Sequence, residues 1–328
     1  MLSFILRRVI ILIPLLFVVS IVAFFVIQLP PGSYIDSYIR NLEAQGGSIN
    51  EEQIAALERQ YGLDQPPIVQ YFTWIGKIVL HGDFGNSFRY QRPVAELLGE
   101  RIPRTIAISI ASMAVTWMIA IPIGILSALK KYSIWDYFFT FLSFLGLSIP
   151  AFLLALVLMY IVFTNTGYMV TGLFSEEFRD AAWSFAKFVD MLKNVWLAIV
   201  VLAISGSAGL IRVLRATLLD ELKKQYVTTA RAKGLPEWRV ILQYPIRIAF
   251  NPIISTIGWM LPAIVGGELV VSMVLNIPTV GPMMLDASLG QDMFLIGGFV
   301  LILTALTLIG TLISDILLAW ADPRIRFE

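Results

Sequence analysis

Long apolar stretches constrain the fold of this chain more than any other feature of its sequence. They lie near Val9–Leu29, Thr105–Leu129, Tyr137–Phe163, Val195–Leu214, Ile248–Leu275 and Phe294–Trp320. Each has about 20 residues or more, the length that a helix needs to cross the roughly 30 Å hydrocarbon core of a bilayer. Only 14% of the 328 residues are charged, against about 25% in soluble domains. The sequence therefore predicts an all-α polytopic membrane protein with about six transmembrane helices. Its net charge of +1 does not indicate a nucleic-acid partner.

The first apolar stretch is followed by a long polar region. The stretch is longer than the apolar part of a signal peptide, so we expect a retained membrane helix, residues 1–29. Residues 30–104 contain a capped amphipathic pattern from Ser48 to Tyr61 that Gly62 would end. A second apolar and aromatic stretch, Tyr71–Leu80, is too short to span a membrane. We expect an ordered loop domain outside the membrane, or an element that lies on the membrane surface.

The positions of the basic residues predict the orientation. Arg7 and Arg8 precede the first stretch, Lys130 and Lys131 follow the second, and further Lys and Arg residues gather after the fourth stretch and at the C-terminus. The short segment 276–293 contains neither Lys nor Arg. Because short cytoplasmic loops carry an excess of Lys and Arg, both termini are predicted to be cytoplasmic.

One basic segment, 220–247, divides the fourth and fifth stretches, and we call it the elbow. Asp220 to Ala232 reads as a helix, and Lys233-Gly234-Leu235-Pro236 then supplies a helix stop. Pro236 can begin a second helix at its first position, and Glu237 favours that N-terminus. A helix–Gly–helix elbow would present Ala230, Ala232, Gly234 and Leu235 to another protein. The alternative is an ordinary basic loop that contacts anionic lipid.

The elbow also carries a resemblance to a known family. Thr229–Leu235, T-A-R-A-K-G-L, resembles the EAA loop of the membrane subunits of ABC importers, in the form used by dipeptide and oligopeptide permeases. Thr228 and Thr229 stand where the family motif has Glu and Ala. Three other segments resemble the same family: F-I-L-R-R at Phe4–Arg8, G-D-F-G-N-S-F at Gly82–Phe88 before R-P-V, and D-P-R-I-R-F at Asp322–Phe327.

The resemblance implies a fold, a function and partners. The fold is that of a type I ABC importer, with a permease core at 105–319, an extracytoplasmic loop domain at 30–104 and a cytoplasmic tail at 320–328. The function is that of a permease subunit of an ATP-driven importer in a prokaryotic inner membrane. The implied partners are a second homologous permease subunit, two cytoplasmic ATPase subunits or domains, and an extracytoplasmic substrate-binding protein. The residues implied in ATPase coupling are Thr229, Ala230, Arg231, Ala232, Lys233, Gly234 and Leu235.

Catalytic chemistry is not expected in this chain. No G-x-x-x-x-G-K-[ST] phosphate loop occurs, so ATP and magnesium would belong to the partner ATPases, and we expect no cofactor here. With one histidine, His81, and no cysteine, the chain cannot form an H-E-x-x-H zinc site or a Cys-His dyad, and we expect no Ser-His dyad. We expect no metal site and no catalytic residue.

The acidic residues within the apolar stretches offer a candidate translocation path. Glu268 stands beside Gly266 and Gly267, with Ser272 one turn later, and this group could line a cavity. Asp315 is expected to form a structural pair near Asp322 and Arg324. The substrate would be a peptide or an oligosaccharide. A secondary transporter, with broken helices at the midplane, or a channel subunit remains the alternative reading of the sequence.

Overall fold

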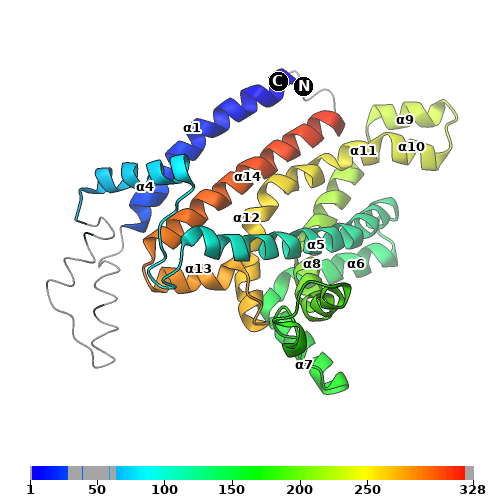
Figure 1. The fold of residues 1–328 in the computed structure, drawn as a ribbon. Helices are drawn as coiled ribbons and strands as arrows, with labels where there is room; N and C mark the ends of the chain where they lie inside the picture. Colours follow the sequence, from blue (N-terminus) through cyan, green and yellow to red (C-terminus); the bar gives the residue numbers. More distant parts are fainter. Residues whose placement is uncertain (1, 29–38, 40–58, 60–63, 322–328) are drawn as a thin grey trace. The chain divides into compact units, whose positions relative to one another are not determined.

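The structure is a computed structural model that describes residues 2–28, 39, 59 and 64–321; at 2–5, 9, 27 and 259–268 it describes the backbone alone. The helices that carry the fold are α1 (Leu2–Ile27), α4 (Pro67–His81), α5 (Val94–Leu129), α6 (Ile134–Ser148), α7 (Ala151–Thr166), α8 (Phe185–Glu221), α9 (Gln225–Ala232), α10 (Glu237–Gln243), α11 (Pro245–Ala249), α12 (Asn251–Val274), α13 (Val280–Leu289) and α14 (Met293–Ala321) (Figure 1). The described part of the chain contains no β-strand, only one isolated bridge between Asn86 and Pro93. The predicted all-α architecture is confirmed.

Candidate membrane spans agree in number with the sequence. Five are long and apolar enough, and the bent pair of α6 and α7 makes a sixth if it counts as one span. The five are Leu6–Val26, Val94–Leu129, Phe185–Glu221, Glu237–Gly258 and Met293–Ala321. The helices around the second and fourth stretches extend well beyond the predicted bounds, since α5 begins at Val94 and α8 at Phe185.

The chain forms two compact units. One comprises Met1–Leu6, Arg104–Thr279 and Thr307–Glu328, and the other comprises Arg7–Pro103 and Val280–Leu306. In the first unit α8 is central, because it packs against α6, α7, α11 and α12. Small residues bring the helices close: Gly124 of α5 lies against Leu214 of α8, and Gly258 of α12 lies against Thr311 of α14. Small residues at helix contacts are typical of membrane bundles.

A sharp break divides the span predicted at Tyr137–Phe163. Helices α6 and α7 meet at an angle of 101°, with extended backbone at Ile149 and Pro150. Proline disfavours helical backbone at the residue before it and lacks the N–H that would continue the helix. Other prolines, such as Pro14 in α1 and Pro122 in α5, remain inside continuous helices. The span predicted at Tyr137–Phe163 is therefore built from two helices that meet at this break.

The second unit is held together by aromatic contacts. Phe24 of α1 packs against Tyr71 and Trp74 of α4, and Leu301 of α14 joins the same buried cluster. The Tyr71 hydroxyl also forms a 2.7 Å hydrogen bond with the Ser20 hydroxyl. Helix α4 ends at Gly82, which takes the left-handed conformation typical of a helix C-terminus. The stretch that is too short to span is therefore an ordered helix packed on α1.

The helix predicted from Asp220 to Ala232 is interrupted, because α8 ends at Glu221 and α9 begins at Gln225. The helix predicted from Ser48 to Tyr61 and the partners of Asp315 in the C-terminal tail lie outside the described residues.

Candidate functional site

The elbow folds as two short helices packed side by side, α9 and α10 (Figure 1). Val227 and Ala230 of α9 and Val240 of α10 form their common core, and all three side chains are buried. Tyr226 and Leu235 pack against this core. Ala230 is therefore not presented to a partner as predicted, because it fills the contact between the two elbow helices.

Gly234 makes the turn between these helices. Its φ is +74°, in the left-handed region, and its N–H donates to the Arg231 carbonyl at 2.9 Å. The predicted helix stop is confirmed. A Cβ at this position would have no atom of this chain within 4 Å, so Gly234 is required by backbone conformation and not by crowding inside the elbow. Pro236 precedes the second helix, which begins at Glu237 and not at Pro236 as predicted.

An ion pair links the two elbow helices across the turn. The Arg231 guanidinium donates to the Glu237 carboxylate at 2.6, 3.1 and 3.2 Å. Both side chains are about half exposed, so the pair adds little stability by itself. Its geometry nevertheless connects the last turn of α9 to the first turn of α10, because two guanidinium nitrogens hold one carboxylate.

The surface that the elbow offers comes from both helices and the turn. Thr229, Arg231, Ala232, Lys233 and Gly234 are exposed, and Leu235 is partly buried. The second helix adds an exposed Trp238, with the Arg239 guanidinium 5.3 Å from the ring centre, and an exposed Leu242. Trp238 and Leu242 were not predicted as part of this surface. A tryptophan between Glu237 and Arg239 could have indicated it, since Trp is enriched where proteins bind each other.

The candidate translocation residues lie along α12. Gly266, Gly267 and Glu268 fall within this helix, where the structure describes only the backbone. Ser272 lies one turn further on, and its side chain is buried in the unit. The four residues share one helix, and nothing more about their side chains follows from the geometry.

A buried ion pair between α6 and α8 was not foreseen from the sequence. The Arg215 guanidinium donates two hydrogen bonds of 2.7 Å to the Asp136 carboxylate, whose side chain is 2% exposed. The same carboxylate accepts the Tyr132 backbone N–H at 2.9 Å. Ser133 caps α6 by accepting the Asp136 N–H. The sequence Ser133–Asp136 has the spacing of a capping box and could have located the acid, although not its partner.

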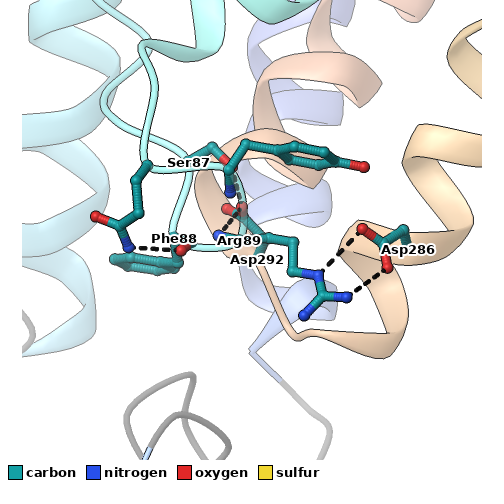
Figure 2. A network of polar contacts seen from close by, with 7 residues as sticks. Ser87, Phe88, Arg89, Asp286 and Asp292 are labelled. Atoms are coloured by element: carbon teal, nitrogen blue, oxygen red, sulfur yellow. Dashed lines mark hydrogen bonds and ion pairs between the residues drawn. The ribbon is translucent and has the colours of Figure 1, made fainter.

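A second polar network lies at the start of α14. The Ser87 hydroxyl donates to the Asp292 carboxylate at 2.5 Å, and the Arg89 backbone N–H donates to the same oxygen at 3.0 Å (Figure 2). The other Asp292 oxygen accepts the Leu295 N–H at 3.1 Å and so caps α14. Burial raises the pKa of the Asp292 carboxyl, while these donors oppose that rise.

Arg89 extends this network to α13. Its guanidinium pairs with Asp286 through two hydrogen bonds of 3.1 Å (Figure 2). The guanidinium lowers the pKa of the Asp286 carboxyl. Burial and the hydrogen bond to Asp286 raise the pKa of the Tyr90 hydroxyl to about 12. The loop that contains the G-D-F-G-N-S-F segment is thus fastened to both α13 and α14.

Within the described residues, no group of three or more His, Cys, Asp or Glu side chains could hold a metal ion. The elbow offers exposed basic and aromatic side chains on a rigid turn, which is an arrangement suited to binding another protein.

Comparisons with known proteins agree on one family. The model of the binding-protein-dependent transport system inner membrane component matches residues 120–327, and the model of its N-terminal region matches residues 1–109. The oligopeptide transport system permease protein AppB of Bacillus subtilis is 36% identical over the full length of both chains. The oligopeptide transport system permease proteins OppB of Haemophilus influenzae and Escherichia coli are each 30% identical, again over both full chains.

Proposed function

Because this chain belongs to the family of binding-protein-dependent transport system inner membrane components, we propose that it is one of two permease subunits of an ATP-driven peptide importer. It is a multi-pass inner-membrane protein and a transport permease subunit. The sister permease, two ATPase subunits or domains and an extracytoplasmic binding protein complete the proposed assembly. ATP and magnesium would bind the ATPases, since this chain has no phosphate loop.

The proposed role in coupling rests on the structure of the elbow. Its two helices share a buried core on either side of the Gly234 turn, and α10 packs on α11, so we expect a force applied to the exposed surface to be passed to α11. Helix α11 packs on both α8 and α12. We propose that the ATPase binds Arg231–Leu235 together with Trp238, and that its movement is transmitted through α11 to the membrane helices.

The proposed orientation places both termini and the elbow in the cytoplasm, and residues 30–104 outside. A cysteine at the exposed Asn86 should then react with a membrane-impermeant maleimide in intact cells, whereas a cysteine at the exposed Gln225 should react only after permeabilisation. The chain has no cysteine of its own, so each label has a single target. The reverse labelling pattern would overturn the orientation.

Peptide is the proposed substrate because the similar permeases are named for oligopeptide transport. The test is uptake into proteoliposomes that contain this chain, its sister permease and the ATPases, with the binding protein added outside. We expect uptake of labelled peptide that requires both ATP and the binding protein. Uptake driven by an ion gradient without ATP would indicate a secondary transporter instead. Uptake of an oligosaccharide and not of peptide would leave the mechanism intact and correct the substrate.

Segment boundaries follow from the same proposal. The membrane core occupies 105–319, and the possible path residues Gly266, Gly267, Glu268 and Ser272 lie on one helix of that core. We retain Glu268 as the proposed polar lining, since an ionisable residue within a membrane helix usually serves a pathway or pairs with another group.

A further inference from the structure

Helix α4 has three faces of different character. One face packs on the core of the second unit through Tyr71, Trp74, Ile75 and Ile78. A second face is polar and carries Gln70, Thr73, Lys77 and His81. The third face is apolar and exposed, and it carries Ile68, Val69, Phe72, Val79 and Leu80. At 3.6 residues per turn, each set falls on its own third of the helix.

The exposed apolar face is continuous along the helix. Phe72 is 59% exposed, Val79 75% and Leu80 77%, and no charged or polar residue interrupts this third of the helix. The polar face has a different environment, because Gln70, Thr73 and Lys77 line a cavity of about 290 Å³ together with Asp83 and Asn86. One face of the helix therefore borders a polar cavity, a second face is apolar and exposed, and the third face packs on the core of the second unit.

The contact with α1 sets the depth of α4. Tyr71 bonds to Ser20 and lies against Phe17 and Phe24, all within the first candidate span. Ser20 lies seven residues before the end of α1 at Ile27, which is about 10 Å along a helix axis. Amphipathic helices in a membrane interface bury their apolar face about 5–10 Å into the boundary between headgroups and acyl chains. The contact therefore places α4 beside the C-terminal part of the first candidate span, where an interfacial helix would lie.

The lipid-facing surface of α1 continues onto α4. Phe17 of α1 is exposed and lies against Tyr71, and the Tyr71 ring in turn contacts that of the exposed Phe72. We propose that α4 is an interfacial helix whose exposed apolar face binds acyl chains, in the leaflet where α1 ends. Its polar face then borders the aqueous cavity, so that α4 separates lipid from water at this end of the second unit.

Site-directed spin labelling tests this placement. Single cysteines at Phe72 and Leu80 would carry labels on the apolar face, and cysteines at the adjacent Thr73 and His81 would carry labels on the polar face. Each variant is reconstituted in lipid nanodiscs, as the chain alone and with its sister permease and ATPases. Val69→Cys serves as a further apolar position, and only variants with the wild-type gel-filtration profile are compared.

Lipid contact predicts a definite pattern of collision rates. Labels at Phe72 and Leu80 should collide several-fold more with oxygen, relative to a water-soluble nickel chelate, than labels at Thr73 and His81, in both preparations. Equal nickel accessibility on the two faces would overturn the proposal, because α4 would lie in water. Labels at Phe72 and Leu80 that reach neither reagent in the full assembly would also overturn it, because a protein subunit would cover the face. The readout does not depend on transport, so failure of the proposed function leaves it unchanged.

Discussion

Ser87 donates a 2.5 Å hydrogen bond to Asp292, although the two residues are 205 positions apart in the chain. The same carboxylate caps the first turn of α14 and accepts the backbone N–H of Arg89. One buried acid therefore holds the loop after α4 on the end of the last long helix. A carboxylate suits this position because every group that faces it is a donor.

Replacing Asp292 by Asn should destabilise this attachment. An amide can accept only through one oxygen, so an NH₂ group would face the Ser87 hydroxyl and the Arg89 N–H, or the Leu295 N–H would lose its acceptor. A buried donor without an acceptor costs about 1–3 kcal/mol. Thermal unfolding in detergent, followed by tryptophan fluorescence, should show the loss. The matched control is Asp286→Asn, at a half-exposed acid in the same network, which should change stability by less than about 1 kcal/mol. Equal effects of the two substitutions would contradict the assigned role of Asp292.

The Arg89–Asp286 pair should make the stability of the protein depend on pH. The pair lowers the folded-state pKa of Asp286 below its usual 3.8, so its stabilisation is fully present above that value and is lost as pH falls through the lower folded value. Arg89→Gln should therefore destabilise the protein at pH 7, by up to about 1 kcal/mol for an exposed pair, and have no effect once Asp286 is protonated. Asp292 has a raised pKa, so its contribution to stability changes with pH in the opposite direction. Wild type and Arg89→Gln both retain Asp292, so this contribution cancels when their unfolding free energies are subtracted. If that difference in unfolding free energy stayed constant with pH, Arg89 would act by packing alone.

The Asp136–Arg215 pair should be a major contribution to the stability of the first unit. Asp136 is 2% exposed but Arg215 is 26% exposed, so removal of the acid should cost somewhat less than the roughly 3–5 kcal/mol of a fully buried pair. We expect Asp136→Asn to lower the unfolding temperature strongly. Asp220→Asn is the control, because Asp220 is exposed and lies 4.0 Å from Lys223, so its loss should cost about 0–1 kcal/mol. Similar small effects at both positions would mean that the α6–α8 contact does not depend on this pair.

The sequence predicted the regular parts of this fold and missed contacts between distant residues. Gly234 and Pro236 act on their immediate neighbours, so the elbow turn could be read from the sequence. Pro150 could not be distinguished from Pro122 in the same way, because proline occurs both within membrane helices and at their breaks, and the surrounding packing decides which. The partners of Asp292 and Asp136 depend on which helices lie side by side, and apolar patterning does not encode that. The burial of Ala230 was missed for the same reason, since it depends on Val240 reaching across the turn.

Substitutions at Gly234 should strain the turn moderately within this chain, and a charged one should act more strongly in the assembly. An Ala there adopts a positive φ at a cost of roughly 1–2 kcal/mol, and its Cβ meets no atom of the elbow. Gly234→Ala should therefore weaken coupling only mildly. Gly234→Asp should leave the chain inserted and paired with its sister permease, yet abolish ATPase recovery and substrate-stimulated ATP hydrolysis. Gly234→Asn introduces a side chain of the same size as Asp that also tolerates the left-handed region. Comparing the Asn and Asp variants therefore separates the effect of side-chain size from the effect of charge. Wild-type ATPase recovery and wild-type transport with Asp would remove the elbow from the mechanism.

Trp238 and Val240 lie two residues apart on α10, and their substitution by alanine should affect different properties, ATPase binding and stability respectively. Trp238 is 61% exposed, whereas Val240 is fully buried against Val227 and Ala230. Trp238→Ala should leave stability within about 0.5 kcal/mol of wild type, since it removes no contact from the core. It should weaken ATPase binding by about 2 kcal/mol or more, because exposed tryptophans that become buried in an interface dominate its energy. Val240→Ala should instead destabilise the elbow by about 1–3 kcal/mol through the cavity that it creates. ATPase affinity and thermal unfolding, measured on both variants, separate these effects. If Trp238→Ala bound the ATPase as tightly as wild type, the docking surface would be confined to α9 and the Gly234 turn, and α10 would serve only to hold them in place.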